Sequence, residues 1–151
     1  MPAARAGKLS ALKTRPIVVD ADFVKSHLGK AGFAVVDGRD PAFYDGVDTG
    51  GQHDEKHRTG HIAGAASIPF TEITQENLVL KSPAELEALF TKAGVKPSDT
   101  VIGYCHIGQQ TTAMLFAART LGHPVLLYDG SFQDWSRHAG YPVDNPAEKT
   151  K

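Results

Sequence analysis

The feature that most constrains this chain of 151 residues is the alternation of short apolar runs with segments of helical periodicity. The apolar runs lack the polar alternation of a half-exposed strand, and such runs are typical of strands buried on both faces of a parallel sheet. The helical segments between them supply the crossovers that join parallel neighbours. The pattern therefore predicts an α/β domain with a mostly parallel sheet, and its expected strands lie at residues 17–19, 33–36, 66–68, 100–104 and 125–128.

Local signals mark where the expected helices begin and end. Asp20 has the position of an N-cap, and residues 82–85 (SPAE) form a capping box with proline at the first helical position. Gly94 follows the apolar stripe of that second helix and suits a helix C-terminus. Two further helices are expected, over residues 111–121 and 132–138.

The chain is expected to form one domain, because it shows no internal repeat and no linker that would divide it. Residues 1–14 have no clear period and predict a flexible lead-in, residues 15–145 the domain, and residues 146–151 a polar tail. The lead-in is basic and lacks the apolar segment of a signal peptide, so the sequence leaves the compartment open.

Composition and charge disfavour several classes of partner. The chain has 16 basic and 17 acidic residues and a net charge of -1, so no large positive field is available to bind nucleic acid. No apolar run approaches the roughly 20 residues of a transmembrane helix, and no membrane partner is expected. The chain has one cysteine, Cys105, and it can form no intrachain disulfide.

The position of Cys105 indicates a reactive thiol. It follows the apolar run 100–104 directly, at the carboxyl end of an expected strand, where open α/β sheets bind ligands. If the next loop curls, its N–H groups and the following helix N-terminus would stabilise a thiolate or a terminal persulfide anion. Glycine within the loop permits the turn. The expected substrate-binding loop consists of His106, Ile107, Gly108, Gln109, Gln110 and Thr111.

Two other interpretations of Cys105 remain open at this point. A lone cysteine is often a small buried apolar residue with no chemical role. Phosphatases and arsenate reductases with a C-x5-R loop use a similar turn, but they place an arginine at its seventh position to bind the oxyanion. Thr111 has that position here, which disfavours phosphoryl transfer.

Four separate segments resemble the rhodanese (thiosulfate sulfurtransferase) superfamily. Residues 35–39 (VVDGR) resemble its V-D-x-R strand end, and residues 60–65 (GHIAGA) its G-H-I-x-G-A segment. Residues 100–105 (TVIGYC) resemble the strand that carries the catalytic cysteine, and residues 128–135 (YDGSFQDW) the late segment with a glycine turn and a tryptophan. One such motif is weak, whereas four in order are specific. The resemblance covers residues 18–143 and implies a three-layer rhodanese-like domain with a central, mostly parallel five-stranded sheet flanked by helices.

The resemblance implies a sulfurtransferase that uses a Cys105 persulfide. The Cys105 thiolate would take the outer sulfur of a small donor of the thiosulfate or mercaptopyruvate type, and a thiol or cyanide would then accept it. A protein acceptor is a further expectation, whereas no metal or organic cofactor is implied. The chain resembles the catalytic C-terminal half of tandem members. The alternative is a rhodanese-like sulfur carrier or sensor module that serves a protein partner without activity on small donors.

The chain departs from the family pattern around the donor site. Rhodaneses that prefer thiosulfate often have arginine and lysine after the cysteine, where this loop has His106 and Ile107. Tandem relatives carry a substrate arginine near the position that aligns with Phe43. A doubly charged donor would therefore depend on backbone N–H groups, on His106 and on Arg58.

Several residues are expected beside the site. Asp37 and Arg39 either support the loop or form a structural ion pair at a strand end. His61 is expected to donate to a backbone carbonyl and fix a turn, and Trp135 to pack near the site wall. On a helix, His53 and residues 57 and 61 would share one face and could bind a metal, but the glycines that flank this stretch disfavour a helix. No metal site is therefore predicted.

Overall fold

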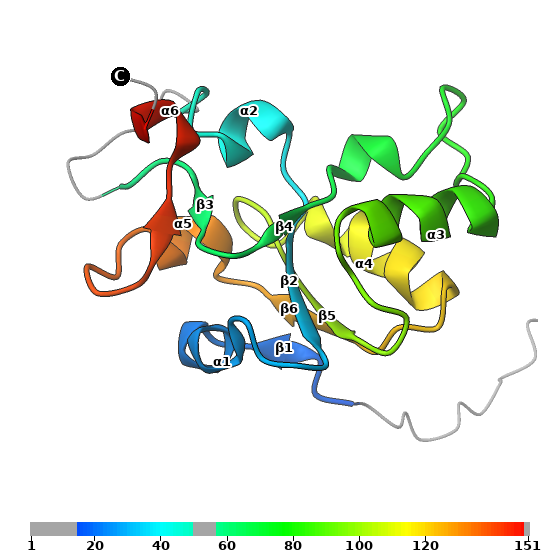
Figure 1. Ribbon diagram of the computed structural model, residues 1–151, viewed down its shortest axis with the longest axis horizontal. Helices are drawn as coiled ribbons and strands as arrows, with labels where there is room; N and C mark the ends of the chain where they lie inside the picture. Colours follow the sequence, from blue (N-terminus) through cyan, green and yellow to red (C-terminus); the bar gives the residue numbers. More distant parts are fainter. Residues whose placement is uncertain (1–14, 50–56, 150–151) are drawn as a thin grey trace, which may run out of the picture.

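A five-stranded parallel sheet lies at the centre of the protein, whose computed structural model describes residues 15–49 and 57–149 (Figure 1). The order of the strands is β1-β6-β5-β2-β4, and every neighbouring pair is parallel. The α/β class and the five parallel strands predicted from the sequence are therefore confirmed. The strands are β1 (Val18–Val19), β2 (Phe33–Asp37), β4 (Ala66–Ser67), β5 (Thr100–Tyr104) and β6 (Val125–Tyr128).

Helices cover both faces of this sheet and make the domain three-layered (Figure 1). Helices α3 (Pro83–Lys92) and α4 (Thr111–Thr120) pack on one face, and α1 (Ala21–His27) and α5 (Ser131–Trp135) on the other. Each central strand supplies both cores, because successive side chains point to opposite faces. Strand β2 sends Val36 to the α3/α4 core and Val35 to the α1/α5 core.

The predicted helix signals at the start of α1 and α3 are confirmed. The Asp20 side chain accepts a hydrogen bond from the Phe23 N–H at 2.8 Å. Ser82 and Glu85 form the reciprocal bonds of a capping box, with the Ser82 N–H donating to Glu85 Oε2 at 2.9 Å. Gly94 has φ +84°, which glycine adopts readily just after a helix end.

Several elements differ from the expectation. Strands β3 (His61–Ile62) and β7 (Val143–Asp144) form a separate antiparallel pair, and α6 (Pro146–Lys149) lies in the segment expected to be a polar tail. The short helix η1 (Phe70–Glu72) was not expected, and α5 ends three residues before the predicted end at 138. Helix α2 (Pro41–Tyr44) lies between β2 and β4, where short helical pieces were expected. These elements are too short to show a period, so only their contacts define them.

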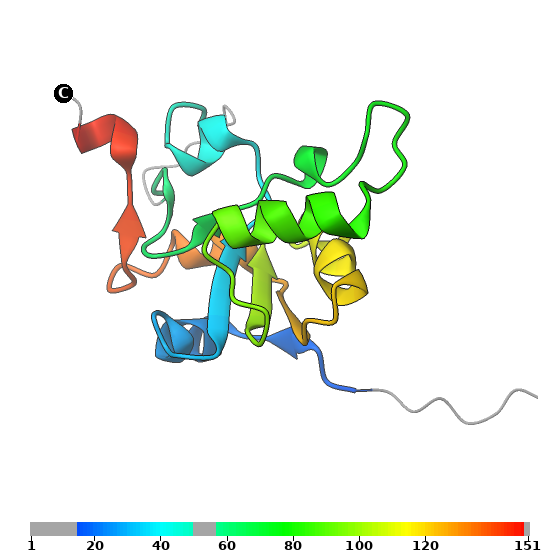
Figure 2. The ribbon, with the colours of Figure 1, turned by 45° about the vertical axis from the view of Figure 1, so that its right-hand side comes forward.

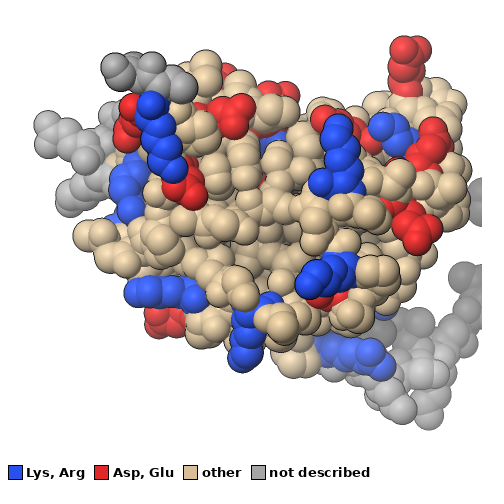
Figure 3. All heavy atoms as spheres, in the orientation of Figure 1, with Lys and Arg blue, Asp and Glu red and all other residues tan. Residues whose placement is uncertain are grey.

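The surface carries charges of both signs. In the view of Figure 3, Lys and Arg alternate with Asp and Glu around a largely uncharged centre. Across the described part of the chain, no helix combines the length and the apolar character that a membrane crossing requires.

Candidate active site

Cys105 lies where β5 ends, beside the carboxyl end of β2. Tyr104, the last residue of β5, pairs in register with Asp37, the last residue of β2. This edge of a parallel sheet is where α/β proteins bind ligands. The Cys105 side chain is fully buried at this edge.

The backbone of the loop 106–110 and of the first residue of α4 has N–H groups without partners among the described residues. Within residues 15–49 and 57–149, no hydrogen bond is formed by the N–H groups of residues 106–111. Gly108 has φ +83°, and a Cβ atom there would lie 2.6 Å from Asp129 Oδ1. The turn therefore needs glycine at this position. The buried side-chain oxygens Gln110 Oε1 and Thr111 Oγ1 also lack a hydrogen-bond partner in the described part of the chain.

The turn that begins α5 holds the cysteine by its backbone. Ser131 Oγ accepts a hydrogen bond from the Cys105 N–H at 3.1 Å and donates one to the Tyr128 carbonyl at 2.9 Å. The Phe132 N–H donates to the Cys105 carbonyl at 3.0 Å, and the N–H of residue 133 donates to the His106 carbonyl at 3.1 Å. Ser131 is not among the residues predicted at the site, although it lies in the segment 128–135 that carries the resemblance. Its φ of +55° and complete burial mark it as a supporting residue of the loop.

Asp37 and Arg39 form a buried ion pair close to this loop. Arg39 Nη2 lies 2.6 Å from Asp37 Oδ2 and also donates to the Gly60 carbonyl at 2.7 Å. Burial by itself would lower the pKa of Arg39, but the charge and hydrogen bonds of Asp37 outweigh burial and raise it. The guanidinium carbon lies 4.3 Å from the centroid of the Phe132 ring. The pair therefore ties β2 to the 60–61 segment and to α5.

His106 and Phe43 form an aromatic contact beside the loop. Their rings meet edge to face with centroids 4.5 Å apart, which joins α2 to the loop. The pKa of His106 is lowered, first by burial and then by the positive charge of Arg39. This shift favours the neutral imidazole, which packs against the Phe43 ring. Ile107, the next residue, has its side chain exposed.

Arg58 does not present a free cation to a sulfur donor. Its guanidinium donates to the carbonyl oxygens of residues 135, 136, 138 and 141, at distances of 2.7 to 3.3 Å. Burial lowers the pKa of Arg58. The guanidinium N–H groups of Arg58 thus bind the chain that follows α5, and its part in binding a doubly charged donor stays a prediction. Trp135 is fully buried there and donates to the Pro142 carbonyl at 3.0 Å, as a packing residue does.

His61 has a structural environment. Its ring stacks on Tyr44 with centroids 3.6 Å apart, and Nδ1 lies 2.8 Å from the Tyr44 carbonyl oxygen. It belongs to strand β3, and residues 57–60 form no helix, so the helical metal face considered above does not exist. Among the described residues no group of three metal-ligating side chains comes together, and His53 lies outside them.

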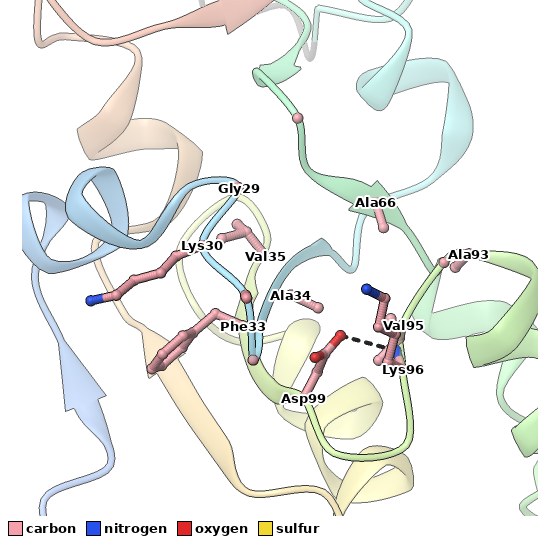
Figure 4. A pocket seen from close by; sticks show the side chains of 14 residues that line it. Gly29, Lys30, Phe33, Ala34, Val35, Ala66, Ala93, Val95, Lys96 and Asp99 are labelled. Carbon is pink, nitrogen blue, oxygen red and sulfur yellow. Dashed lines mark hydrogen bonds between the residues drawn. The ribbon is translucent and has the colours of Figure 1, made fainter.

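A second hollow lies at the opposite end of the sheet. Figure 4 shows it between the amino end of β2, near Phe33 and Ala34, and the chain that follows α3. The carboxylate of Asp99 points into this region and accepts a hydrogen bond from the Lys96 N–H at 2.9 Å. The lining of this hollow includes Lys30, Lys96 and Asp99 but no cysteine.

Comparisons with known proteins identify curated relatives that are longer than this chain. The chain is 33% identical over 115 residues to "Putative thiosulfate sulfurtransferase 1" of Mycobacterium bovis, a match that covers 73% of this chain and 42% of that protein. It is 40% identical over 88 residues to 3-mercaptopyruvate sulfurtransferase of Escherichia coli, covering 58% of this chain and 31% of that protein. The chain therefore spans less than half the length of these relatives.

Solved structures and a family description agree on the fold. The anaerobic ergothioneine biosynthesis enzyme from Chlorobium limicola, in complex with trimethyl histidine, matches with a TM-score of 0.75 at 24% identity. That match covers 85% of this chain and 32% of the enzyme, and at this sequence identity it is evidence for the fold alone. The family description "Rhodanese-like domain" matches residues 20–138, which is most of the chain. The chain belongs to the rhodanese family.

Proposed function

We propose that this protein is a sulfurtransferase that carries sulfur as a persulfide on Cys105. The observation that carries the proposal is a single buried thiol at the carboxyl edge of the sheet, followed by consecutive N–H groups without partners in the described chain. Such groups stabilise a thiolate or a persulfide anion, as a side-chain cation would. The names of the curated relatives, thiosulfate and 3-mercaptopyruvate sulfurtransferases, support the same chemistry.

The proposed reaction has two steps. The Cys105 thiolate attacks the outer sulfur of a small donor of the thiosulfate or mercaptopyruvate type, and a sulfur–sulfur bond forms on Cys105. The bond to the donor remnant breaks with its electron pair on the remnant, which is sulfite or the enolate of pyruvate. A thiol or cyanide then attacks the outer sulfur, and the electron pair of the broken bond returns to Cys105. Neither step requires a metal, an organic cofactor or an external oxidant.

The described residues favour a donor with little charge over thiosulfate. Burial lowers the pKa of His106 and so favours its neutral form, Arg39 is paired with Asp37, and Arg58 is bound to carbonyls. We therefore propose mercaptopyruvate, with one carboxylate, as a better small donor than thiosulfate. The loop N–H groups and an edge of the His106 ring would bind the carboxylate.

Intact-mass measurement tests the proposal. We expect the protein to gain one sulfur atom on incubation with mercaptopyruvate or thiosulfate, and to lose it on addition of cyanide. Cys105→Ser, which keeps the shape of the side chain, is expected to show no gain. If the wild-type protein gains no sulfur from either donor, the enzyme proposal is wrong. A carrier module that receives sulfur from a protein partner would then be the better interpretation.

A further inference from the structure

An apolar groove lies next to the Cys105 loop, between η1, the hairpin of residues 74–80 and the first turn of α4. The groove encloses about 450 Å³ and is lined by Phe70, Ile73, Thr74, Leu78 and Ala113, among others. Figures 1 and 2 show the 74–80 hairpin projecting from the body of the domain beside η1. Phe116, one turn after Ala113 on α4, is 59% exposed and continues the apolar surface.

The hairpin presents Leu78 in a strained conformation. Leu78 is 82% exposed and has φ +63°, a left-handed backbone that is unfavourable for leucine. The turn is held by hydrogen bonds from the Gln75 N–H to the Val79 carbonyl at 2.8 Å and from the Leu78 N–H to the Gln75 carbonyl at 2.9 Å. An exposed leucine in this conformation adds nothing to the core. Strain of this kind is found at sites that serve function, and here it holds an apolar side chain over the groove.

Backbone contacts connect the groove to the Cys105 loop. The Phe70 N–H donates to the Gly38 carbonyl at 3.0 Å, so η1 is anchored to the end of β2. Gly38 in turn packs against Thr111, since a Cβ atom on Gly38 would lie 3.1 Å from the Thr111 Cα atom. Thr111 ends the loop, and Ala113 lies two residues later in the groove wall. The groove wall and the Cys105 loop are therefore joined through Gly38 and Thr111.

The rim of the groove is acidic. Glu72 of η1 and Glu76 of the hairpin are both exposed. In Figure 3 the right-hand part of this face, where the hairpin and α3 lie, carries several acidic side chains with basic ones among them. A partner that places an apolar side chain in the groove gains attraction from basic residues beside it.

We infer that this groove docks a protein sulfur acceptor, which inserts an apolar side chain beside Leu78, sets basic residues against Glu72 and Glu76, and directs its thiol to Cys105. This inference rests on the proposed function. The thiolate of the acceptor attacks the outer sulfur of the Cys105 persulfide, and a new sulfur–sulfur bond forms on the acceptor. The original bond breaks, and its electron pair remains on Cys105 as the thiolate. The acceptor leaves as a persulfide, and no other reactant is consumed.

The experiment compares peptide acceptors with cyanide. Cys105 is loaded with polysulfide and desalted, so that the result does not depend on the natural donor. The first probe is a synthetic peptide with one cysteine, one leucine and two lysines, and the second has aspartate in place of its leucine. We expect the second-order rate of sulfur transfer to be about tenfold higher for the leucine peptide, because burial of a leucine side chain supplies at least that factor.

Two variants separate docking from folding. Leu78→Asn removes the apolar group, but asparagine tolerates the left-handed backbone, so its melting temperature should equal or exceed that of the wild type. We expect Leu78→Asn to abolish the advantage of the leucine peptide and Glu76→Lys to reduce it several-fold. Glu148→Lys makes the same charge change on α6, away from the groove, and should leave the advantage of the leucine peptide unchanged. Transfer to cyanide should be the same in all four proteins.

Two results would overturn the inference. Equal rates for both peptides on wild-type protein, with normal transfer to cyanide, would show that the groove does not dock the acceptor while leaving the persulfide chemistry intact. A Leu78→Asn variant that retains the full preference for the leucine peptide would exclude Leu78 from the contact. Failure of Cys105 to take up or release any sulfur would instead refute the proposed function, and the docking inference with it.

Discussion

At the scale of single residues, His106 is expected to make the stability of the folded protein depend on pH. Its pKa in the folded protein is lowered by burial and by Arg39, whereas in the unfolded chain it titrates near the usual value of about 6.5. Between these two values the unfolded chain binds more protons than the folded one. The contribution of His106 to the free energy of unfolding therefore has its full value at pH values above the pKa of the unfolded chain. This contribution decreases as the pH falls below that pKa.

The prediction for His106 is tested by urea unfolding of the wild type and of His106→Gln. We expect the wild-type stability, relative to the variant, to decline as the pH falls from about 7 to 5 and to stay constant above about 7.5. Glutamine retains a polar side chain but has no proton to gain in this range. A difference that rises on acidification would mean that the folded protein stabilises the charged imidazole, contrary to its buried position.

At the scale of secondary structure, the cysteine loop depends on the turn that begins α5. Ser131→Ala removes the acceptor of the buried Cys105 N–H, so we expect the loop to shift and sulfur loading to slow by about ten- to a hundredfold. The pH dependence of Cys105 alkylation should change in the same variant, because the loop N–H groups move relative to the sulfur. Ser136→Ala is the matched control, since Ser136 is buried just after the same helix and makes only a 3.4 Å bond to the Gln133 carbonyl. Equal loading rates in both variants would contradict the assignment.

At the scale of the whole molecule, Arg58 joins parts of the chain that are far apart in sequence. Its hydrogen bonds to carbonyls of residues 135–141 lie beside the β3–β7 pair, which brings the C-terminal segment back to residues 61–62. This connection closes the α1/α5 side of the domain. None of these Arg58 hydrogen bonds is made to a strand of the central sheet.

Replacing Arg58 with glutamine is expected to lower the free energy of unfolding by about 2 kcal/mol, because half-buried carbonyls lose a charged donor. Denaturant unfolding measures the loss, and sulfur loading below the transition should persist because the Arg58 guanidinium is bound to carbonyls after α5. The control is Lys149→Gln, whose exposed ion pair with Asp144 is worth less than about 1 kcal/mol. Equal losses in the two variants would show that Arg58 is no more than a surface residue.

Local patterns in the sequence determine the strands of the central sheet and the helices α1, α3 and α4. Uninterrupted apolar runs predict the five parallel strands, and the capping box at Ser82 and the glycine at position 94 predict the limits of α3. The position of Cys105 at a strand end also follows from the sequence alone, because the run 100–104 and the helix at Thr111 lie on either side of it. These features depend on neighbours within a few residues, and periodicity reports such contacts directly.

Contacts between distant segments determine the rest. The pairing of β3 with β7, the bonds of Arg58 to the chain after α5 and the support of Cys105 by Ser131 all join residues that no local pattern relates. The apolar groove beside Leu78 likewise exists only where η1, a hairpin and α4 meet. Whether an arginine binds a substrate or a carbonyl, and whether a leucine is core or surface, depends on which segments folding brings together. Sequence periodicity reports contacts within a few residues and does not show which distant segments meet. Only the three-dimensional structure shows those contacts.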